Sequence, residues 1–223
     1  MEWEDAFEIL DSILPGETVL LEYTPSYIPE FVLKAFVEYS KERKVPLLID
    51  DDFDTLHTIA TRARFLGVEM DLSGAKVIKT GGKEEEVGNV VARVAFHPDA
   101  GVYIRNYEEA GRRVLGDAQY PMLNLVLGIE NLFLFMRSSL NSYQLILSIQ
   151  RFLGNRRRKA FYLVNREALE TLSSGVLEEL ERISTTVIKM NPYPTGARGN
   201  VKKSVNPSLT GKKFDIAVRG LGA

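Results

Sequence analysis

Short apolar runs alternate with helical stripes along almost the whole chain, and this alternation limits the possible folds more than any other feature. Runs such as residues 18–22, 45–49 and 123–129 are apolar at nearly every position. Such strands are buried on both faces, which is typical of parallel sheets covered by helices. Between residues 28 and 39, apolar side chains recur at helical spacing. We therefore predict an α/β fold of three layers, with a mainly parallel sheet between two layers of helices. The predicted strands are residues 18–22, 45–49, 75–79, 90–96, 123–129, 160–164, 186–190, 201–205 and 214–218.

The two ends of the chain depart from this alternation. Residues 1–14 carry apolar side chains at helical spacing and predict a leading helix. Residues 191–199 are rich in Pro and Gly and predict a loop, and the two strands after them are joined by a short turn. We expect residues 191–223 to form this loop and an antiparallel hairpin at one edge of the sheet. A chain of 223 residues is slightly short for two ordinary domains, so we expect one domain over residues 1–223.

Composition excludes several kinds of site. The chain has no cysteine, which rules out disulfides, thiolate metal ligands and a cysteine nucleophile. Its two histidines are too few for a histidine-rich metal site, and we expect neither a metal nor a cofactor. The start of the chain lacks a signal-peptide pattern, and no apolar run is long enough to cross a membrane. We expect a cytoplasmic protein, and the abundant Glu, Lys and Arg are typical of a thermophile.

Several segments occur in the order and spacing of a known superfamily. The opening is LPGETVLLEYTPSYIPEFVLKAFVEYSKERKVPLLIDDDFDTL, and LNLVLGIEN, RRRKAFYLVN and TTVIKM follow it. Together they span residues 13–190, in which the chain resembles the RecA/KaiC ATPases of the P-loop NTPase fold. It also resembles a small uncharacterised family from hyperthermophilic archaea. The first resemblance implies a RecA/KaiC-like sheet, with a phosphate loop after the first strand and catalytic acids after the second.

The residues at the phosphate-loop position do not fit a nucleotide. The motif G-x-x-x-x-G-K-[ST] needs glycines to curl the backbone around phosphates, a lysine for their charge and a hydroxyl for Mg²⁺. Here the lysine position holds Pro29 and the hydroxyl position holds Glu30, whose carboxylate would face the phosphate. We predict that Mg-ATP does not bind there and that the protein is not an enzyme. The eight positions are Tyr23, Thr24, Pro25, Ser26, Tyr27, Ile28, Pro29 and Glu30.

Acidic residues lie where the superfamily keeps its catalytic and metal-supporting acids. Asp50 and Asp51 follow the second strand, and Glu130 or Gly128 falls at the metal-supporting position. A catalytic role would require an attacking water and a bound phosphate. In the alternative interpretation, one aspartate of residues 50–52 caps the helix that begins near Phe53, the others are solvated, and Glu130 ends a strand in solvent.

Basic residues gather in two places although the net charge is only −2. Residues 196–223 contain six Lys and Arg side chains against one acidic side chain. Such clusters can contact nucleic-acid phosphates, but for residues 156–159 we favour the alternative of a solvated loop before a buried strand. The candidate residues for nucleic acid are Arg156, Arg157, Arg158, Lys159, Lys202 and Lys203.

These patterns leave three hypotheses for function. The leading one is a non-hydrolysing protein that binds a peptide or protein segment at residues 23–30, because an aromatic and apolar rim fits a peptide better than a polyanion. It includes a homo-oligomer as a possible state. The second is a nucleic-acid-binding paralogue that uses the basic residues. The third is an enzyme with an atypical site around Asp50, Asp51 and Glu130.

Overall fold

The computed structural model describes residues 3–83, 87–116, 121–172 and 175–217. Its strands are β1 (Thr18–Tyr23), β2 (Leu47–Asp52), β3 (Lys76–Thr80), β4 (Asn89–Val94), β5 (Met122–Leu127), β6 (Arg158–Asn165), β7 (Thr186–Tyr193), β8 (Gly196–Lys203) and β9 (Lys213–Ala217). Its helices are α1 (Glu4–Ser12), α2 (Ile28–Arg43), α3 (Thr55–Phe65), α4 (Ala100–Gly116), α5 (Ile129–Met136), α6 (Ser139–Arg151), α7 (Arg166–Leu172) and α8 (Val176–Ile183), with a 3-10 turn at Pro207–Leu209.

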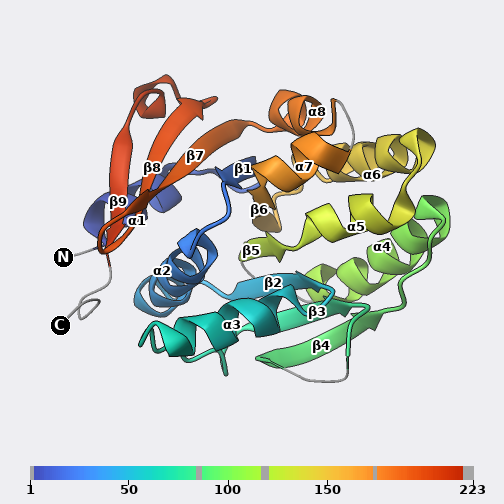
Figure 1. Cartoon of the computed structure of the whole chain (residues 1–223), viewed down its shortest axis with the longest axis horizontal. Helices are drawn as coiled ribbons and strands as arrows, with labels where there is room; N and C mark the ends of the chain where they lie inside the picture. The colour runs from blue at the N-terminus through green and yellow to red at the C-terminus, as the bar shows by residue number, and fades with distance from the viewer. Residues whose placement is uncertain (1–2, 84–86, 117–120, 173–174, 218–223) are drawn as a thin grey trace.

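The strands of the described residues join in one sheet in the order β4-β3-β2-β5-β6-β1-β7-β8-β9. Strands β1 to β7 are parallel, and β8 and β9 are antiparallel. Figure 1 shows the C-terminal strands β7, β8 and β9 extending one side of the sheet, with β3 and β4 on the other. The predicted α/β class and its antiparallel C-terminal edge are confirmed.

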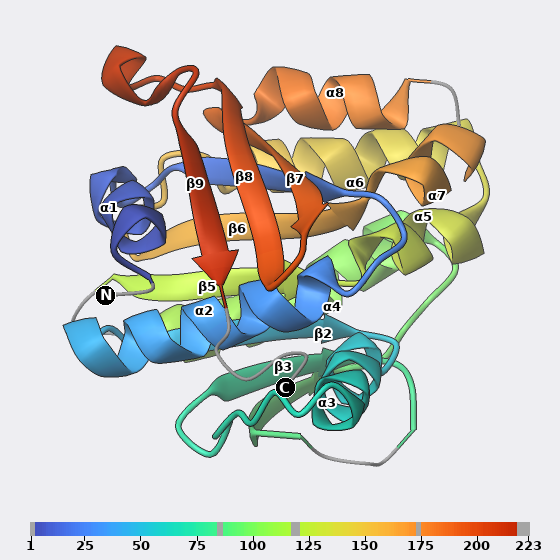
Figure 2. The same ribbon diagram turned by 60° about the vertical axis from the view of Figure 1, so that its left-hand side comes forward.

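Helices cover both faces of the sheet because successive strand side chains point to opposite faces. Helices α1, α2 and α3 pack on one face, where Leu21, Leu125 and Phe161 belong to their core. Helices α4 to α8 pack on the other face, against Leu20, Val126 and other alternating residues. Figure 2 shows α2 lying in front of β5 and β2, and α1 beside β9.

The predicted loop over residues 191–199 is wrong in most of its length. Strand β7 continues to Tyr193, and β8 begins at Gly196, so only the turn between them is irregular. Pairing of β7 with β1 ends at Lys189. Pro192 therefore lies where β7 has only β8 as a neighbour, and a proline that lacks an N–H is tolerated there. Of the last predicted strand, Val218 lies outside the described residues.

Two helices on the same face of the sheet begin at glycines with positive φ. Strand β5 stops at Leu127 because Gly128, with φ of 81°, turns the chain into α5. Helices α7 and α8 are separate elements, and Gly175, with φ of 95°, is the N-cap residue of α8. Across the described ranges, no helix is long and apolar enough to cross a membrane.

Candidate functional site

The connection from β1 to α2 occupies the phosphate-loop position. Residues 24–27 link the two elements, and α2 carries Pro29 in its first turn, where proline is well tolerated. The hydroxyl of Ser26 donates to the carbonyl of Thr24 at 2.8 Å and accepts from the backbone N–H of Ile28 at 3.4 Å. These local bonds hold the short loop in a turn.

Glu30 and Arg62 form an ion pair at the start of α2. Glu30 is completely buried, and its Oε1 accepts a hydrogen bond of 2.5 Å from Nε of Arg62 on α3. A second nitrogen of Arg62 lies 3.4 Å from the Ser26 carbonyl, and the guanidinium lies 5.7 Å from the centre of the Tyr27 ring. The N-terminal end of a helix attracts negative charge. In this chain, the carboxylate of Glu30 supplies that charge from within the helix itself.

The eight residues of the predicted site differ in how far they reach the surface. Only Pro25 and Tyr27 are exposed, while Tyr23, Thr24 and Ser26 are half-buried. Ile28, Pro29 and Glu30 are buried within α2. A ligand at this edge would therefore meet the loop over residues 23–27 and the exposed part of Arg62. Sequence reasoning missed Arg62, because nothing near it in the chain marks a partner 32 residues away.

The three aspartates of residues 50–52 lie inside β2 and are all buried. The N-cap residue of α3 is Asp54, whose side chain makes no capping hydrogen bond, so the predicted N-cap among residues 50–52 is wrong in position. Oδ1 of Asp51 instead accepts from the N–H of Leu56 in the first turn of the helix at 2.8 Å. The ammonium of Lys79 lies 3.5 Å from its Oδ2. The expectation that the other two aspartates are solvated is wrong, because the strand continues through Asp52 and buries both.

Asp50 and Asp52 face α4, on the opposite side of the sheet from Asp51. Oδ2 of Asp50 accepts from the hydroxyl of Tyr107 at 3.0 Å and from Nδ2 of Asn124 at 2.9 Å. Burial raises the pKa of Asp50, and it raises the pKa of Asp52 well above its usual range. Both line a cavity of about 40 Å³ together with Tyr162, which holds a few waters at most. The cavity is too small for a nucleotide.

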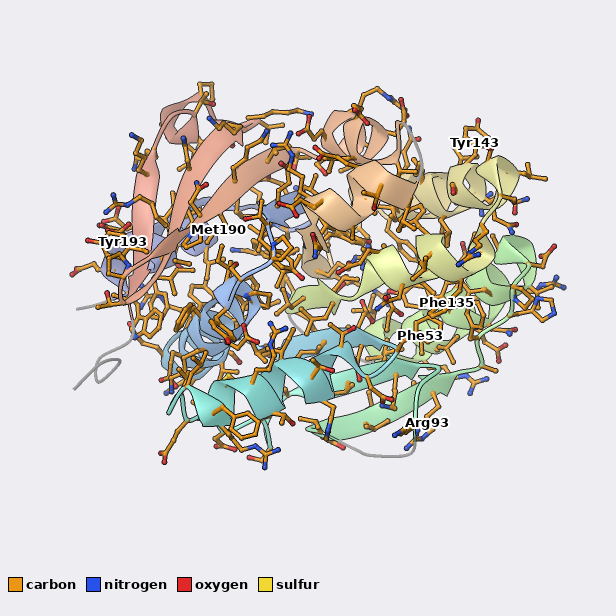
Figure 3. The ribbon with its side chains drawn as sticks, viewed as in Figure 1. Phe53, Arg93, Phe135, Tyr143, Met190 and Tyr193 are labelled. Atoms are coloured by element: carbon orange, nitrogen blue, oxygen red, sulfur yellow. The ribbon has the colours of Figure 1, made fainter. Side chains whose placement is uncertain are left out.

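The start of α3 is shifted from its predicted place near Phe53. The helix begins at Thr55, and Phe53 and Asp54 both have positive φ. The Phe53 ring packs against Phe96 and Phe135, with centroids 5.0 and 4.8 Å away. Figure 3 shows Phe53 and Phe135 close together between β2 and α5. These aromatic contacts account for the tight turn that separates the aspartates from the helix.

Gly128, not Glu130, directly follows β5. A Cβ at Gly128 would lie 2.1 Å from Oγ1 of Thr55 and 2.6 Å from the carbonyl oxygen of Asp52, so no acidic side chain fits there. Glu130 lies in the first turn of α5 and does not end a strand in solvent as expected. Its Oε2 is buried with no hydrogen-bond partner among the described residues. Burial raises the pKa of Glu130 to about 7.

A second buried carboxylate, Glu22, lies near the end of β1. Neither of its oxygens has a hydrogen bond within the described ranges, although Lys189 lies 3.6 Å from Oε2. Burial and then the neighbouring carboxylate of Glu181 raise the pKa of Glu22 to about 7. The candidate acids thus occupy both faces of the sheet and helix α5, and Asp50, Asp51 and Glu130 do not converge on one point. Sequence reasoning missed Asp52, which its spacing of two from Asp50 places on the same face of a strand.

A comparison with protein-family models assigns the chain to a family. Residues 8–215 match the family described as Pyrococcus protein of unknown function, DUF257. The chain belongs to this family. No curated protein matches it in sequence.

Solved structures confirm the RecA/KaiC-like fold of this DUF257 chain. A protein of Pyrococcus horikoshii OT3 studied as PH0250 is 28% identical, with a TM-score of 0.82, and the match covers 98% of this chain and all of that one. The flagellar accessory protein FlaH from Methanocaldococcus jannaschii is 14% identical, with a TM-score of 0.59 and 92% and 88% covered. The KaiC-like protein PH0186 from P. horikoshii OT3 is 13% identical, with a TM-score of 0.56 and 89% and 84% covered.

The basic residues of the DUF257 chain do not form one surface. Arg158 is buried at the start of β6, where it donates to Oδ1 of Asn124 at 2.5 Å and stacks on Phe152 at 4.7 Å. Both sequence interpretations, a phosphate contact and a solvated loop, are therefore wrong for Arg158. Lys159 donates to the carbonyl of Leu10 at 3.0 Å.

The remaining basic candidates lie toward the amino ends of the parallel strands. A guanidinium nitrogen of Arg157 lies 3.3 Å from the carbonyl of Leu115, and Arg156 is exposed. Lys202 and Lys203 are exposed on β8, where Lys203 lies opposite Val187 near the start of β7. This end of the sheet is opposite the end that carries residues 23–30.

Proposed function

We propose that this protein is a non-hydrolysing binding protein on a RecA/KaiC-like scaffold. In this proposal the phosphate loop is lost, and the loop over residues 23–27 contacts a peptide or a segment of a partner protein. A cytoplasmic location and assembly with further copies of the chain belong to the same proposal.

The ion pair between buried Glu30 and partly exposed Arg62 is the observation that carries the proposal. A phosphate at the start of α2 would meet a carboxylate that is completely buried and already paired at 2.5 Å. A like charge near a triphosphate costs about 1–4 kcal/mol per charge pair at a protein surface. Pro29 supplies neither an ammonium group nor an N–H to offset this cost.

The exposed side chains of the loop favour a peptide over a small polar ligand. Tyr27 is 54% exposed and lies against the guanidinium of Arg62, and Pro25 is exposed beside it. Tyrosine and arginine are, with tryptophan, enriched at the energetic centres of protein interfaces. Arg62 also retains hydrogen-bond donors for peptide carbonyl groups.

Isothermal titration with Mg-ATP and Mg-ADP tests the loss of nucleotide binding. We expect no heat of binding at millimolar nucleotide and no release of phosphate. Micromolar binding with turnover would overturn the proposal. The Glu30→Gln variant is titrated in the same way. This substitution removes the opposing charge but does not restore a lysine, so we expect that the variant does not bind nucleotide either.

Selection of displayed peptides on the immobilised full chain tests the partner class. We expect the selected peptides to bind the wild type and to lose about tenfold or more in affinity to Tyr27→Ala, since hot-spot aromatic residues contribute about 2 kcal/mol or more. Tyr143→Ala is the matched control, because Tyr143 is 58% exposed on α6. Peptides that respond equally to both variants would contradict binding at residues 23–27.

The two rival functions gain less support from the geometry. Nucleic-acid binding would have to proceed without Arg158, which is buried, and with Lys159 bonded to a backbone carbonyl. An enzyme around Asp50, Asp51 and Glu130 would have to use side chains from two faces of the sheet. We therefore do not extend the proposal to either.

A further inference from the structure

A pocket of about 400 Å³ lies where α5, α6 and α7 meet, apart from residues 23–30. Arg137 and Ser138 at the junction of α5 and α6 line it, together with Ser139 and Ser142 of α6 and Thr171 of α7. Phe133 and Leu172 provide apolar walls. We call it the α5–α6 pocket. Tyr143 and Phe135, labelled in Figure 3, mark the nearby ends of α6 and α5.

The pocket contains the N-terminal end of a helix of 13 residues. Ser138 is its N-cap, and its hydroxyl accepts from the N–H of Asn141 at 3.1 Å. The first turn of α6 contains no acidic residue. The positive end of the helix dipole is therefore not neutralised from within the helix.

Ser142 provides an independent indication of a ligand. It is only 8% exposed and lines the pocket, and its hydroxyl makes no hydrogen bond to another of the described residues. Its oxygen does not belong to the buried polar atoms that lack a partner, so water or a ligand in the pocket can reach it and complete its hydrogen bonds. Here the open side of that hydroxyl is the pocket.

Arg137 adds a full positive charge at the same place. Its Nε donates to the carbonyl of Leu134 at 3.1 Å, and the side chain is exposed. No ion pair engages it within the described residues. The other guanidinium N–H groups remain available, and their planar fork matches the oxygens of a phosphate.

We propose that the α5–α6 pocket binds a small phosphate monoester. Arg137 and the N–H groups at the start of α6 would hold the phosphate, and the hydroxyls of Ser139 and Ser142 would donate to its oxygens. The volume exceeds the need of a phosphate alone, and Phe133 and Leu172 fit an apolar remainder. This site is separate from the proposed peptide site and does not depend on it.

Isothermal titration of the full chain with inorganic phosphate, phenyl phosphate and phenol tests the proposal. We expect both phosphates to bind, phenyl phosphate at least several-fold tighter, and phenol not to bind. Phenyl phosphate that binds no tighter than inorganic phosphate would overturn the assignment of an ester, and no heat with either would overturn the site.

Three variants distinguish binding in the α5–α6 pocket from nonspecific attraction of the phosphate to exposed positive charge. Arg137→Gln and Ser142→Ala should each weaken phenyl phosphate about tenfold, since hydrogen bonds to charged groups contribute about 1.5–3 kcal/mol. Arg156→Gln is the control, because it removes an exposed arginine at the far end of the sheet and should leave the affinity unchanged. Equal losses in Arg137→Gln and Arg156→Gln, or none in Ser142→Ala, would contradict the proposal.

Discussion

Helices α2 and α6 both begin on the side of the sheet where the parallel strands end, but on opposite faces, and their first turns differ in charge. Helix α2 carries Glu30, which is buried and paired with Arg62. The first turn of α6 contains serines and no acid, with Arg137 beside it. The backbone dipole is the same in both helices. Side chains alone decide whether a helix start is neutralised internally or left available to an anion.

Loss of the cation from each helix start should produce the largest contrast. Arg62→Ala leaves Glu30 buried without its partner, and we expect a loss of about 3 kcal/mol, at the low end for broken buried pairs because Arg62 is partly exposed. Arg137→Ala removes no ion pair with another described residue and should change stability by less than about 0.5 kcal/mol. Urea unfolding of both variants measures the difference. Equal losses would break the comparison.

Glu130 of α5, which precedes α6 in the chain, should make the stability of the protein depend on pH. Burial raises the pKa of Glu130 from 4.5 to about 7, so the folded state favours its protonated form. The stability from this group is complete below about pH 4.5 and is lost as pH rises through 7. Glu130→Gln should therefore gain about 2 kcal/mol relative to the wild type between pH 5 and pH 8.

Ser142→Ala is the control for this pH effect. It changes no titrating group, so its difference from the wild type in urea unfolding should be the same at both pH values. A constant difference for Glu130→Gln would show that Glu130 does not titrate in this range.

The smallest expected change in stability comes from a substitution that gives α6 an acidic first turn like that of α2. Ser139→Glu places a carboxylate in the first turn of α6 and should stabilise the protein by about 0.3–1 kcal/mol through the helix dipole. The same charge should weaken phenyl phosphate about tenfold or more, because it opposes the phosphate at short range. Thermal unfolding and titration measure the two effects. Unchanged affinity would place the phosphate elsewhere.

The sequence predicts the central strands well because each is a run of apolar residues between turn signals, whereas β8, with the sequence GARGNVKK, lacks such a run and is misplaced. It also predicts an aspartate that bonds to the start of α3, although not its position, because Asp51 and Leu56 are only five residues apart and the interaction is local. The sequence does not predict the burial of Asp50, because the partners of this carboxylate, Tyr107 and Asn124, lie 57 and 74 residues away along the chain. Read locally, three consecutive aspartates after an apolar run predict the solvated end of a strand.

The candidate sites illustrate the same limit. The unusual residues at the phosphate-loop position are visible in the sequence, but Arg62, which neutralises Glu30, is brought there only by the packing of α3 on α2. Arg158 stands in a run of basic residues that is typical of a solvated loop, yet it is buried by Asn124 and Phe152. The α5–α6 pocket joins three helices and has no signature in any one of them.

The hydrogen bonds that join Asp50, Asn124 and Arg158 link three adjacent strands, β2, β5 and β6, inside an otherwise apolar core. Parallel strands of Leu and Val could slide past one another with little penalty from contacts alone. If β5 slipped by one residue, Asn124 would point to the other face, and an acid and a base would be left buried without partners. These hydrogen bonds therefore fix the register of β2, β5 and β6 in the middle of the sheet, where burial of apolar side chains alone would specify it less strictly.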